Sequence, residues 1–392
     1  MLSFWFFAGP ALVLAFLSLR GERKRAAYVA GRLAEAPPPD MDKALPPATV
    51  IVPVKGGDPG LRENLAALAA QDYPNYELIV VAHRAADIPA GVLPARARVV
   101  LANAQEPGTG EKVLNLRTAV RFARKDSLLY AFADSDGRVS RTWLRALASP
   151  LSRSMSTSMT DTRVGASTGY RWYAPEPPDF WSLMRSVWDA VIGGTFSSGS
   201  NAFAWGGSMA IRRETFHAIR VPDFWRDTVS DDYALSDAVR RAGLRIVFAP
   251  GAMAVSTDRT SGRAFLAWAR RQLTITRVYR PRLWWTALVA HIFYCGGMAA
   301  AIIASIHGSR GAEWVLLAQL SPGMLKGANR ATLAKAELPE YKPWFDRHAW
   351  VHTLWVPLAT WIWLIVLLAS AFGNRIEWRG NRYRLKTVHP RA

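Results

Sequence analysis

Residues 128–137, LLYAFADSDG, decide the fold of this chain. Residues 128–133 form an uncharged run with the length of a buried strand, and the run ends abruptly in Asp-Ser-Asp-Gly. Ligands of open α/β sheets bind outside the carboxyl ends of the strands, where Asp134 and Asp136 fall. Two such aspartates offer oxygen ligands to a hard divalent cation such as Mg²⁺ or Mn²⁺, although a plain strand-ending turn uses the same residue types.

Short β-branched runs alternate with helical patterns before this stretch. We expect strands at 49–54, 76–82 and 97–102, and helices at 61–70 and 112–124. This alternation predicts an α/β domain with a mostly parallel sheet flanked by helices. A Pro-rich segment, PPPDMDKALPP, ends at residue 47 and marks the start of the domain.

Three long apolar runs lie outside this domain, at 2–19, 283–306 and 354–372, and basic residues flank each of them. About 20 apolar residues in a helix cross the hydrocarbon core, and Lys and Arg gather on the cytoplasmic side. We therefore expect a multi-pass protein of the bacterial inner membrane in which the domain between the first two apolar runs is cytosolic. The shorter run at 314–325 contains Ser-Pro-Gly and fits a span, a re-entrant hairpin or an interfacial helix.

These patterns divide the 392 residues into five segments. They are a transmembrane anchor at 1–20, a basic and Pro-rich linker at 21–47, a cytosolic domain at 48–282, transmembrane or interfacial helices at 283–372 and a basic cytosolic tail at 373–392. The net charge of +19 needs no nucleic acid to explain it, because basic residues beside spans meet anionic lipid. The single cysteine, Cys295, excludes an intramolecular disulfide framework and a multi-cysteine metal site.

A second acidic cluster, Asp231-Asp232-Tyr233, comes directly before a helical pattern at 234–242. Acidic residues there complement the helix dipole, and Ser230 or Asp231 can cap the helix. A carboxylate beside a cleft can instead accept a proton from an attacking hydroxyl group. The pattern alone leaves both interpretations open.

Two further segments carry side chains suited to a ligand. Gly206 and Gly207 allow the backbone to approach a ligand closely, or serve a tight turn. Trp268, Arg270 and Arg271 lie just before the second apolar run. Arginines suit phosphate oxygens and tryptophan covers a sugar face, but a juxtamembrane helix touching lipid head groups would have the same composition.

Taken in order, these segments resemble the family 2 inverting glycosyltransferases, and most closely their membrane-bound ceramide glucosyltransferase-like branch. The likeness covers nearly the whole chain. It rests on VPVKGGDP at 52–59, QDYP at 71–74, EKVLNL at 111–116, DSD at 134–136, the Gly-Gly-Ser-Met segment, DDY at 231–233 and a W-R-G ending within 376–383.

The resemblance implies a GT-A fold, a nucleotide-sugar donor such as a UDP-hexose, a lipid acceptor and a divalent cation. Asp134 and Asp136 would hold the metal, and Asp232 would be the general base that deprotonates the acceptor hydroxyl. The resemblance assigns the donor site to Pro53, Lys55, Asp87, Lys112, Asp134, Arg213, Trp268, Arg270 and Arg271. Asp87 is the nearest carboxylate where the family usually has an aspartate after the second strand, and Ala267 stands where an arginine usually precedes the tryptophan.

Two other hypotheses fit parts of the sequence. A processive polysaccharide synthase shares the fold, but few spans remain here for a translocation channel. A catalytically impaired relative that binds nucleotide sugar or lipid would explain the missing family aspartate and arginine. The presence of Asp134, Asp136 and Asp232 argues against that second alternative.

Overall fold

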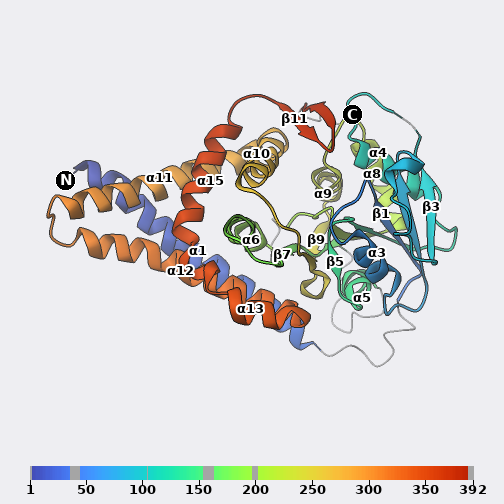
Figure 1. The fold of residues 1–392 in the computed structure, drawn as a ribbon, viewed down its shortest axis with the longest axis horizontal. Helices are drawn as coiled ribbons and strands as arrows, with labels where there is room; N and C mark the ends of the chain where they lie inside the picture. Colours follow the sequence, from blue (N-terminus) through green and yellow to red (C-terminus); the bar gives the residue numbers. More distant parts are fainter. Residues whose placement is uncertain (1, 36–44, 104, 153–162, 197–201, 387–392) are drawn as a thin grey trace. The chain divides into compact units, whose positions relative to one another are not determined.

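A computed structural model describes residues 2–35, 45–103, 105–152, 163–196 and 202–386 (Figure 1). The chain forms two compact units whose segments alternate along the sequence. The helical unit comprises Met1–Ala30, Tyr173–Thr195 and Arg259–Asn374. The sheet unit comprises Gly31–Trp172, Phe196–Asp258 and Arg375–Ala392. These units describe packing, and the predicted functional boundaries at 20, 47, 282 and 372 stay predictions.

The sheet unit is built on a seven-stranded sheet in the order β3-β2-β1-β4-β8-β6-β9. Its strands are β1 (Ala48–Pro53), β2 (Tyr76–Ala82), β3 (Ala97–Leu101), β4 (Leu129–Ala133), β6 (Val164–Thr168), β8 (Ser208–Arg212) and β9 (Arg245–Phe248). Strand β8 is antiparallel to both of its neighbours, and the other neighbouring pairs are parallel. The expected mostly parallel α/β sheet is therefore confirmed, and the four predicted strands are present.

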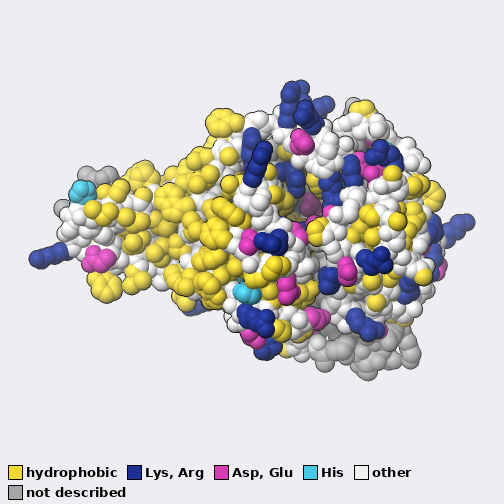
Figure 2. All heavy atoms as spheres, viewed as in Figure 1, with side chains coloured by type: hydrophobic (Ala, Val, Ile, Leu, Met, Phe, Trp, Pro, Cys, Tyr) yellow, Lys and Arg dark blue, Asp and Glu magenta, His cyan; other side chains and the backbone are white. Residues whose placement is uncertain are grey.

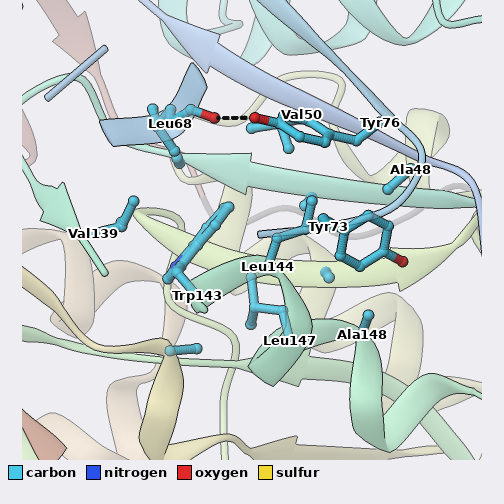
Figure 3. Packing of buried hydrophobic residues seen from close by; sticks show 14 of the residues in the cluster. Ala48, Val50, Leu68, Tyr73, Tyr76, Val139, Trp143, Leu144, Leu147 and Ala148 are labelled. Carbon is cyan, nitrogen blue, oxygen red and sulfur yellow. Dashed lines mark hydrogen bonds between the residues drawn. The ribbon is translucent and has the colours of Figure 1, made fainter. Parts of the chain in front are cut away.

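Successive strand residues point to opposite faces of this sheet, and apolar side chains lie on both faces. Helices therefore cover both faces. One face packs against α3 (Leu61–Ala69) and α5 (Trp143–Ala148), as Figure 3 shows for Val50, Leu68 and Trp143. The hydroxyl of Tyr76 in this cluster donates to the carbonyl of Leu68 over 3.1 Å. The other face packs against α4 (Glu111–Arg121), α7 (Arg213–Ala218), α8 (Val221–Phe224) and α9 (Asp231–Arg241).

Two smaller sheets complete the strand inventory of the described residues. One has the order β5-β10-β7, formed by β5 (Arg138–Val139), β10 (Ala254–Ser256) and β7 (Arg171–Tyr173). The other is an antiparallel hairpin of β11 (Arg375–Trp378) and β12 (Asn381–Arg384). We call residues 375–384 the C-terminal hairpin.

Among the described residues, two helices of the helical unit are long and apolar enough to cross a membrane, Phe4–Ala34 within α1 (Leu2–Ala34) and α11 (Pro281–Ile306). Only 17% and 28% of their apolar windows are buried in the protein. Figure 2 shows hydrophobic side chains gathered over these helices. The remaining helices are α6 (Phe180–Gly193), α10 (Gly262–Tyr279), α12 (Ala312–Glu337), α13 (Lys342–His348), α14 (Val351–Leu354) and α15 (Val356–Ser370).

Two predicted apolar segments take a more definite form in the structure. The expected third span at 354–372 contains α15, a helix of 15 residues. The segment at 314–325 lies within α12, which continues through Pro322 as one helix of 26 residues. A re-entrant hairpin at 314–325 is therefore excluded, because the helix does not reverse.

Polar contacts tie α12 to α1 inside the helical unit. Lys326 donates to the Ser18 hydroxyl over 2.6 Å, and Arg330 lies 3.2 Å from the Glu22 carboxylate. Further along both helices, Arg25 and Glu337 form a 3.5 Å ion pair. Because the numbering rises together in all three pairs, α1 and α12 run in the same direction.

Tryptophan rings hold α6, α10 and α15 together in the same unit. The ring of Trp188 stacks on that of Trp363, with centroids 4.1 Å apart and an interplanar angle of 11°. Trp268 meets the Trp188 ring edge-on at 5.4 Å. Such aromatic pairs add to the apolar burial that holds helices together.

Candidate active site

The candidate site lies at the carboxyl edge of the central sheet, where β1, β2 and β4 end side by side. The loops after these strands contact one another. The Gly56 amide donates to the Asp87 carbonyl over 2.7 Å, and the Ser135 hydroxyl donates to the Asp58 carboxylate over 2.6 Å. The sequence placed Asp134 and Asp136 at this edge, and the structure confirms that placement.

Arg171, from β7, joins the two aspartates of the Asp-Ser-Asp turn. Its guanidinium donates to both Asp136 oxygens over 3.0 and 2.5 Å, and to Asp134 over 3.2 Å. Burial by itself raises the pKa of the Asp136 carboxyl, but the charges of Arg171, Arg379 and Lys112 outweigh burial and lower it. Both carboxylates therefore face one shared cation.

Lys112, near the beginning of α4, connects this turn to the second acidic cluster. Its Nζ lies 2.8 Å from Asp134 Oδ1 and 3.2 Å from Asp231 Oδ1. Burial lowers the pKa of the Lys112 ammonium group, but the charges of Asp134 and Asp231 raise it above its ordinary value. Lys112 thus stays protonated at neutral pH and bridges acidic groups that are far apart in the sequence.

Asp231 is buried, and its second oxygen, Oδ2, has no hydrogen-bond partner among the described residues. Burial, partly offset by Lys112 and reinforced by Asp232 and Asp134, raises the pKa of Asp231 to about 6. An ideal Cβ on Gly206 would lie 2.4 Å from that oxygen, and one on Gly207 would lie 2.2 Å from the Trp205 ring and 2.6 Å from Asp134 Oδ2. Close approach to a carboxylate therefore explains Gly206, and close approach to both the Trp205 ring and Asp134 explains Gly207.

Asp232 lies at the beginning of α9 and is less buried than Asp231. Its Oδ1 accepts hydrogen bonds from the Ser230 hydroxyl and from the Tyr233 amide. Ser230 is the N-cap, because its hydroxyl accepts from the same amide over 3.2 Å. The capping interpretation is confirmed for Ser230, and the general-base role of Asp232 stays a prediction.

The Asp-Ser-Asp turn suits a hard divalent cation that takes its other ligands from substrate and water. Across the described residues, no cluster of three or more His, Cys, Asp or Glu side chains could hold a metal by itself. Mg²⁺ in nucleotide enzymes is often bound by one or two carboxylates plus substrate phosphates. The position of the Arg171 guanidinium between the two carboxylates shows that a positive group fits there.

Three other residues assigned to the donor site lie near the same edge. Pro53 ends β1, and Lys55 follows it with its Nζ 2.7 Å from the Glu111 carboxylate. Asp87 is buried after β2, where its carboxylate accepts from the Arg84 amide over 2.9 Å. Their contacts with a nucleotide stay a prediction.

The structure corrects the assignment of Arg213 to the donor site. Antiparallel β8 begins opposite Ala133 and ends opposite Leu129, so the residue after it lies at the other edge of the sheet from Asp134. The Arg213 guanidinium donates to the carbonyls of Arg124 and Lys125 over 3.0 and 2.9 Å. It therefore stabilises the turn before β4 and does not join the carboxylate cluster.

The other three residues assigned to the donor site belong to α10 of the helical unit. Trp268 packs against Tyr173, Trp188 and Phe265 in that unit. The Arg270 Nε donates to the Ala369 carbonyl over 3.1 Å. A donor-site role for Trp268, Arg270 and Arg271 stays a prediction.

Sequence reasoning missed two arginines that contact the acidic groups. Arg171 lies in a strand of three residues that has no spacing signature, so nothing in the sequence marks it. Arg379 stood in the W-R-G ending without a role, and its guanidinium binds the Asp58 carboxylate at 2.8 and 3.0 Å. The W-R-G motif was the signal in the sequence that could have marked Arg379, but Asp58, the residue that Arg379 binds, lies 321 positions away.

Comparison with solved structures finds glycosyltransferases. A mannosyltransferase from Pyrobaculum calidifontis, solved with GDP-Man and Mn²⁺, is 18% identical, covers 93% of this chain and 97% of its own, and has a TM-score of 0.42. Glucosyl-3-phosphoglycerate synthase from Mycobacterium tuberculosis, solved with Mn²⁺, uridine diphosphate and phosphoglyceric acid, is 17% identical, covers 61% and 80%, and has a TM-score of 0.39. No curated protein matches the chain.

A family model gives the assignment. The model described as glycosyl transferase family 21 matches residues 4–389, which include the apolar helices, the carboxylate cluster and the C-terminal hairpin. The match broadly supports the resemblance to family 2 and its ceramide glucosyltransferase-like branch, and it supports the enzyme class; the family that the model names is family 21. The chain therefore belongs to glycosyl transferase family 21 and is a glycosyltransferase.

Proposed function

We propose that this glycosyltransferase transfers a hexose from a nucleotide sugar, a UDP-hexose, to a lipid hydroxyl group with inversion at the anomeric carbon. The sheet unit would bind the donor as a GT-A domain at the cytosolic face of a membrane, the bacterial inner membrane. One observation carries most of the proposal: the two carboxylates after β4 converge on a single cationic group. A divalent cation bound to a sugar diphosphate would place positive charge at the same point between the two carboxylates.

The donor diphosphate would lie between the acidic turn and the basic side chains around it. When bound, Mg²⁺ or Mn²⁺ would be held by Asp134 and Asp136 and would neutralise charge on the leaving diphosphate. Lys112 and Arg171 already contact these carboxylates and are positioned to take up diphosphate oxygens. Fixed positive groups of this kind stabilise charge that develops in the transition state.

Asp232 would act as the general base. It takes the proton of the acceptor hydroxyl while that oxygen attacks the anomeric carbon. The bond from this carbon to the diphosphate oxygen breaks, and its electron pair leaves with the nucleoside diphosphate. The free oxygen of buried Asp231 is suited to accept a hydrogen bond from a substrate hydroxyl group, which would help to orient the reactants.

We infer three membrane crossings, by α1, α11 and α12. Arg379 contacts Asp58 within the sheet unit, so an even number of crossings must separate these residues in the chain. Helix α11 provides one. Helix α12 is not among the helices that its length and composition alone mark as spans, but we assign the return to it because it runs beside α1 in the same direction. With its 15 residues, α15 is about 22 Å long, short of the roughly 30 Å hydrocarbon core, and would lie at the inner face.

The test is donor hydrolysis and transfer by the purified full chain in detergent. A panel of UDP- and GDP-sugars is incubated with Mn²⁺ or Mg²⁺, with and without a total lipid extract, beside the Asp134→Ala variant. Lipid-stimulated, metal-dependent release of one nucleotide, lost in the variant, is the expected result. Release from none of the donors, together with no metal-dependent nucleotide binding, would overturn the proposal in favour of a non-catalytic relative.

A further inference from the structure

The C-terminal hairpin contacts the loop after β1 through Arg379, which lies at its tip. Arg379 donates to both oxygens of Asp58 over 2.8 and 3.0 Å and to the Lys55 carbonyl over 2.7 Å. One terminal nitrogen of the guanidinium donates to both Asp58 oxygens and the other donates to the Lys55 carbonyl, so the planar guanidinium fixes orientation as well as distance. The loop that carries Lys55 and Asp58 is thus held from outside the sheet, by residues more than 300 positions further along the chain.

Asp58 also contacts the turn that carries Asp134 and Asp136. The same Oδ2 that accepts from Arg379 also accepts from the hydroxyl of Ser135 over 2.6 Å. Ser135, which stands between Asp134 and Asp136 in the sequence, is buried. Its carbonyl accepts a hydrogen bond from the Asn64 amide group over 3.0 Å. A continuous path of hydrogen bonds therefore runs from Arg379 through Asp58 to Ser135.

A second set of contacts joins the hairpin to the beginning of α4. The Asn381 amide group donates to the Glu111 carboxylate over 2.8 Å, and the same carboxylate oxygen accepts from Lys55 over 2.7 Å. The backbone amide of Glu111 donates to the Tyr383 hydroxyl over 3.3 Å. The next residue, Lys112, reaches Asp134, so the hairpin also supports the other side of the cluster.

The backbone at Arg379 is unfavourable for an arginine. Arg379 and Gly380 form the two-residue loop of the hairpin, with φ of 47° and 79°. Two-residue hairpin loops with positive φ at both positions favour Asn-Gly or Gly-Gly, and a side chain such as arginine is strained in that region. The presence of an arginine at this position is best explained by what its guanidinium binds.

We propose that Arg379 is a positioning residue for the donor site, acting through Asp58 and Ser135 on the turn that carries Asp134 and Asp136. This inference rests on the proposed function, because it concerns the same donor and metal. Four residues, 371–374, separate the end of α15 from the beginning of the hairpin.

The variant Arg379→Asn separates the effect of the guanidinium contacts from that of the backbone conformation of the hairpin loop. Asparagine suits the first position of this loop, so the turn is kept while both carboxylate bonds are lost. We expect KM for the nucleotide sugar and the half-saturating Mn²⁺ concentration to rise about tenfold, with a smaller change in kcat. Arg379→Lys should recover only part of the loss, because a single ammonium nitrogen cannot reproduce the fork in which one guanidinium nitrogen binds Asp58 and the other binds the Lys55 carbonyl.

Arg382→Ala is the matched control. Arg382 lies in the same hairpin, and its side chain is 88% exposed and 3.6 Å from Glu377. Its removal should leave KM, kcat and the Mn²⁺ requirement within twofold of wild type. Thermal unfolding of each variant in detergent shows whether the fold is kept.

A double-mutant cycle tests the path itself. If Asp58 connects the two residues, Ser135→Ala and Arg379→Asn should raise KM for the donor less in combination than the product of their separate effects. Multiplicative effects would overturn the path, and an unchanged donor KM in Arg379→Asn would overturn the positioning role. A wild-type enzyme that turns over no donor would instead contradict the proposed function, so the two failures are distinguishable.

Discussion

The guanidinium of Arg171 donates to both carboxylate oxygens of Asp136, over 3.0 and 2.5 Å. Arg171 therefore holds positive charge where we propose that a divalent cation binds. A metal that enters there must share these oxygens with the guanidinium or displace it. The protein without metal is thus stabilised by its own cation at this place.

Arg171→Gln should make the protein more dependent on metal for its stability. Without the guanidinium, the carboxylates of Asp134 and Asp136 lose a shared partner, which should cost about 1–3 kcal/mol of unfolding free energy in metal-free buffer. Added Mn²⁺ should then raise the unfolding temperature more in the variant than in wild type. Arg98→Gln, which removes an exposed 3.4 Å ion pair with Glu77, is the control. Equal Mn²⁺ shifts in all three proteins would contradict the metal site.

Asp232→Asn and Asp136→Ala should fail in different ways. Loss of a general base lowers turnover by roughly 10²- to 10⁴-fold, and the Asp232 variant should still bind the nucleotide sugar within a few fold of wild type. Loss of a metal ligand should weaken metal-dependent nucleotide binding itself. Steady-state kinetics and binding titrations with and without Mn²⁺ separate these outcomes. Near wild-type turnover in Asp232→Asn would show that the base is another group.

Asp231 should make stability depend on pH below neutrality. Its pKa is raised from 3.8 to about 6, so the folded protein binds this proton more tightly than the unfolded chain. The contribution is complete below pH 3.8 and is lost as the pH rises through about 6. From pH 7 to pH 5, this group should stabilise wild type by about 1 kcal/mol, and Asp231→Asn should lack that gain.

Thermal unfolding in detergent at the two pH values measures this difference. Asp126→Asn, which changes an exposed carboxylate paired with Arg124, is the control and should respond to pH as wild type does. If the stability of Asp231→Asn changed between pH 7 and pH 5 as much as that of wild type, Asp231 would not be the source of the pH dependence.

Cysteine labelling should place residues 307–311 and the C-terminal hairpin on opposite sides of the membrane. The background is Cys295→Ser, which removes the single native cysteine. In intact cells, a membrane-impermeant maleimide should label Ser309→Cys, whereas Arg382→Cys should react only after lysis. Labelling of both positions from the same side would contradict the crossing by α12.

The sheet was predictable because its strands are continuous apolar runs with clear ends. Residues 76–82 were predicted as a strand with the observed bounds, and the acidic turn after β4 follows from where its apolar run stops. Periodicity reports local burial, which is what fixes these elements. The course of residues 314–325 was left open, since proline inside an apolar run is compatible with both a break and a continuing helix.

The partners of the acidic groups were less predictable. Arg213 was assigned to the donor site, but the direction of β8 puts it at the opposite edge, and strand direction depends on tertiary pairing. Arg171 and Asp136 are 35 positions apart and meet only because β7 and the loop after β4 converge in the fold. Residue type and spacing along one segment carry no information about such meetings.

The stacking of Trp188 on Trp363 has a practical consequence for expression. A fragment cut at residues 48 and 282 would keep α6 and α10 but lose α15, and with it the ring that covers Trp188. The exposed apolar faces of both helices would then favour aggregation. A soluble form of the enzyme is better sought by replacing the outward-facing residues of α1 and α11 in the full chain than by truncation.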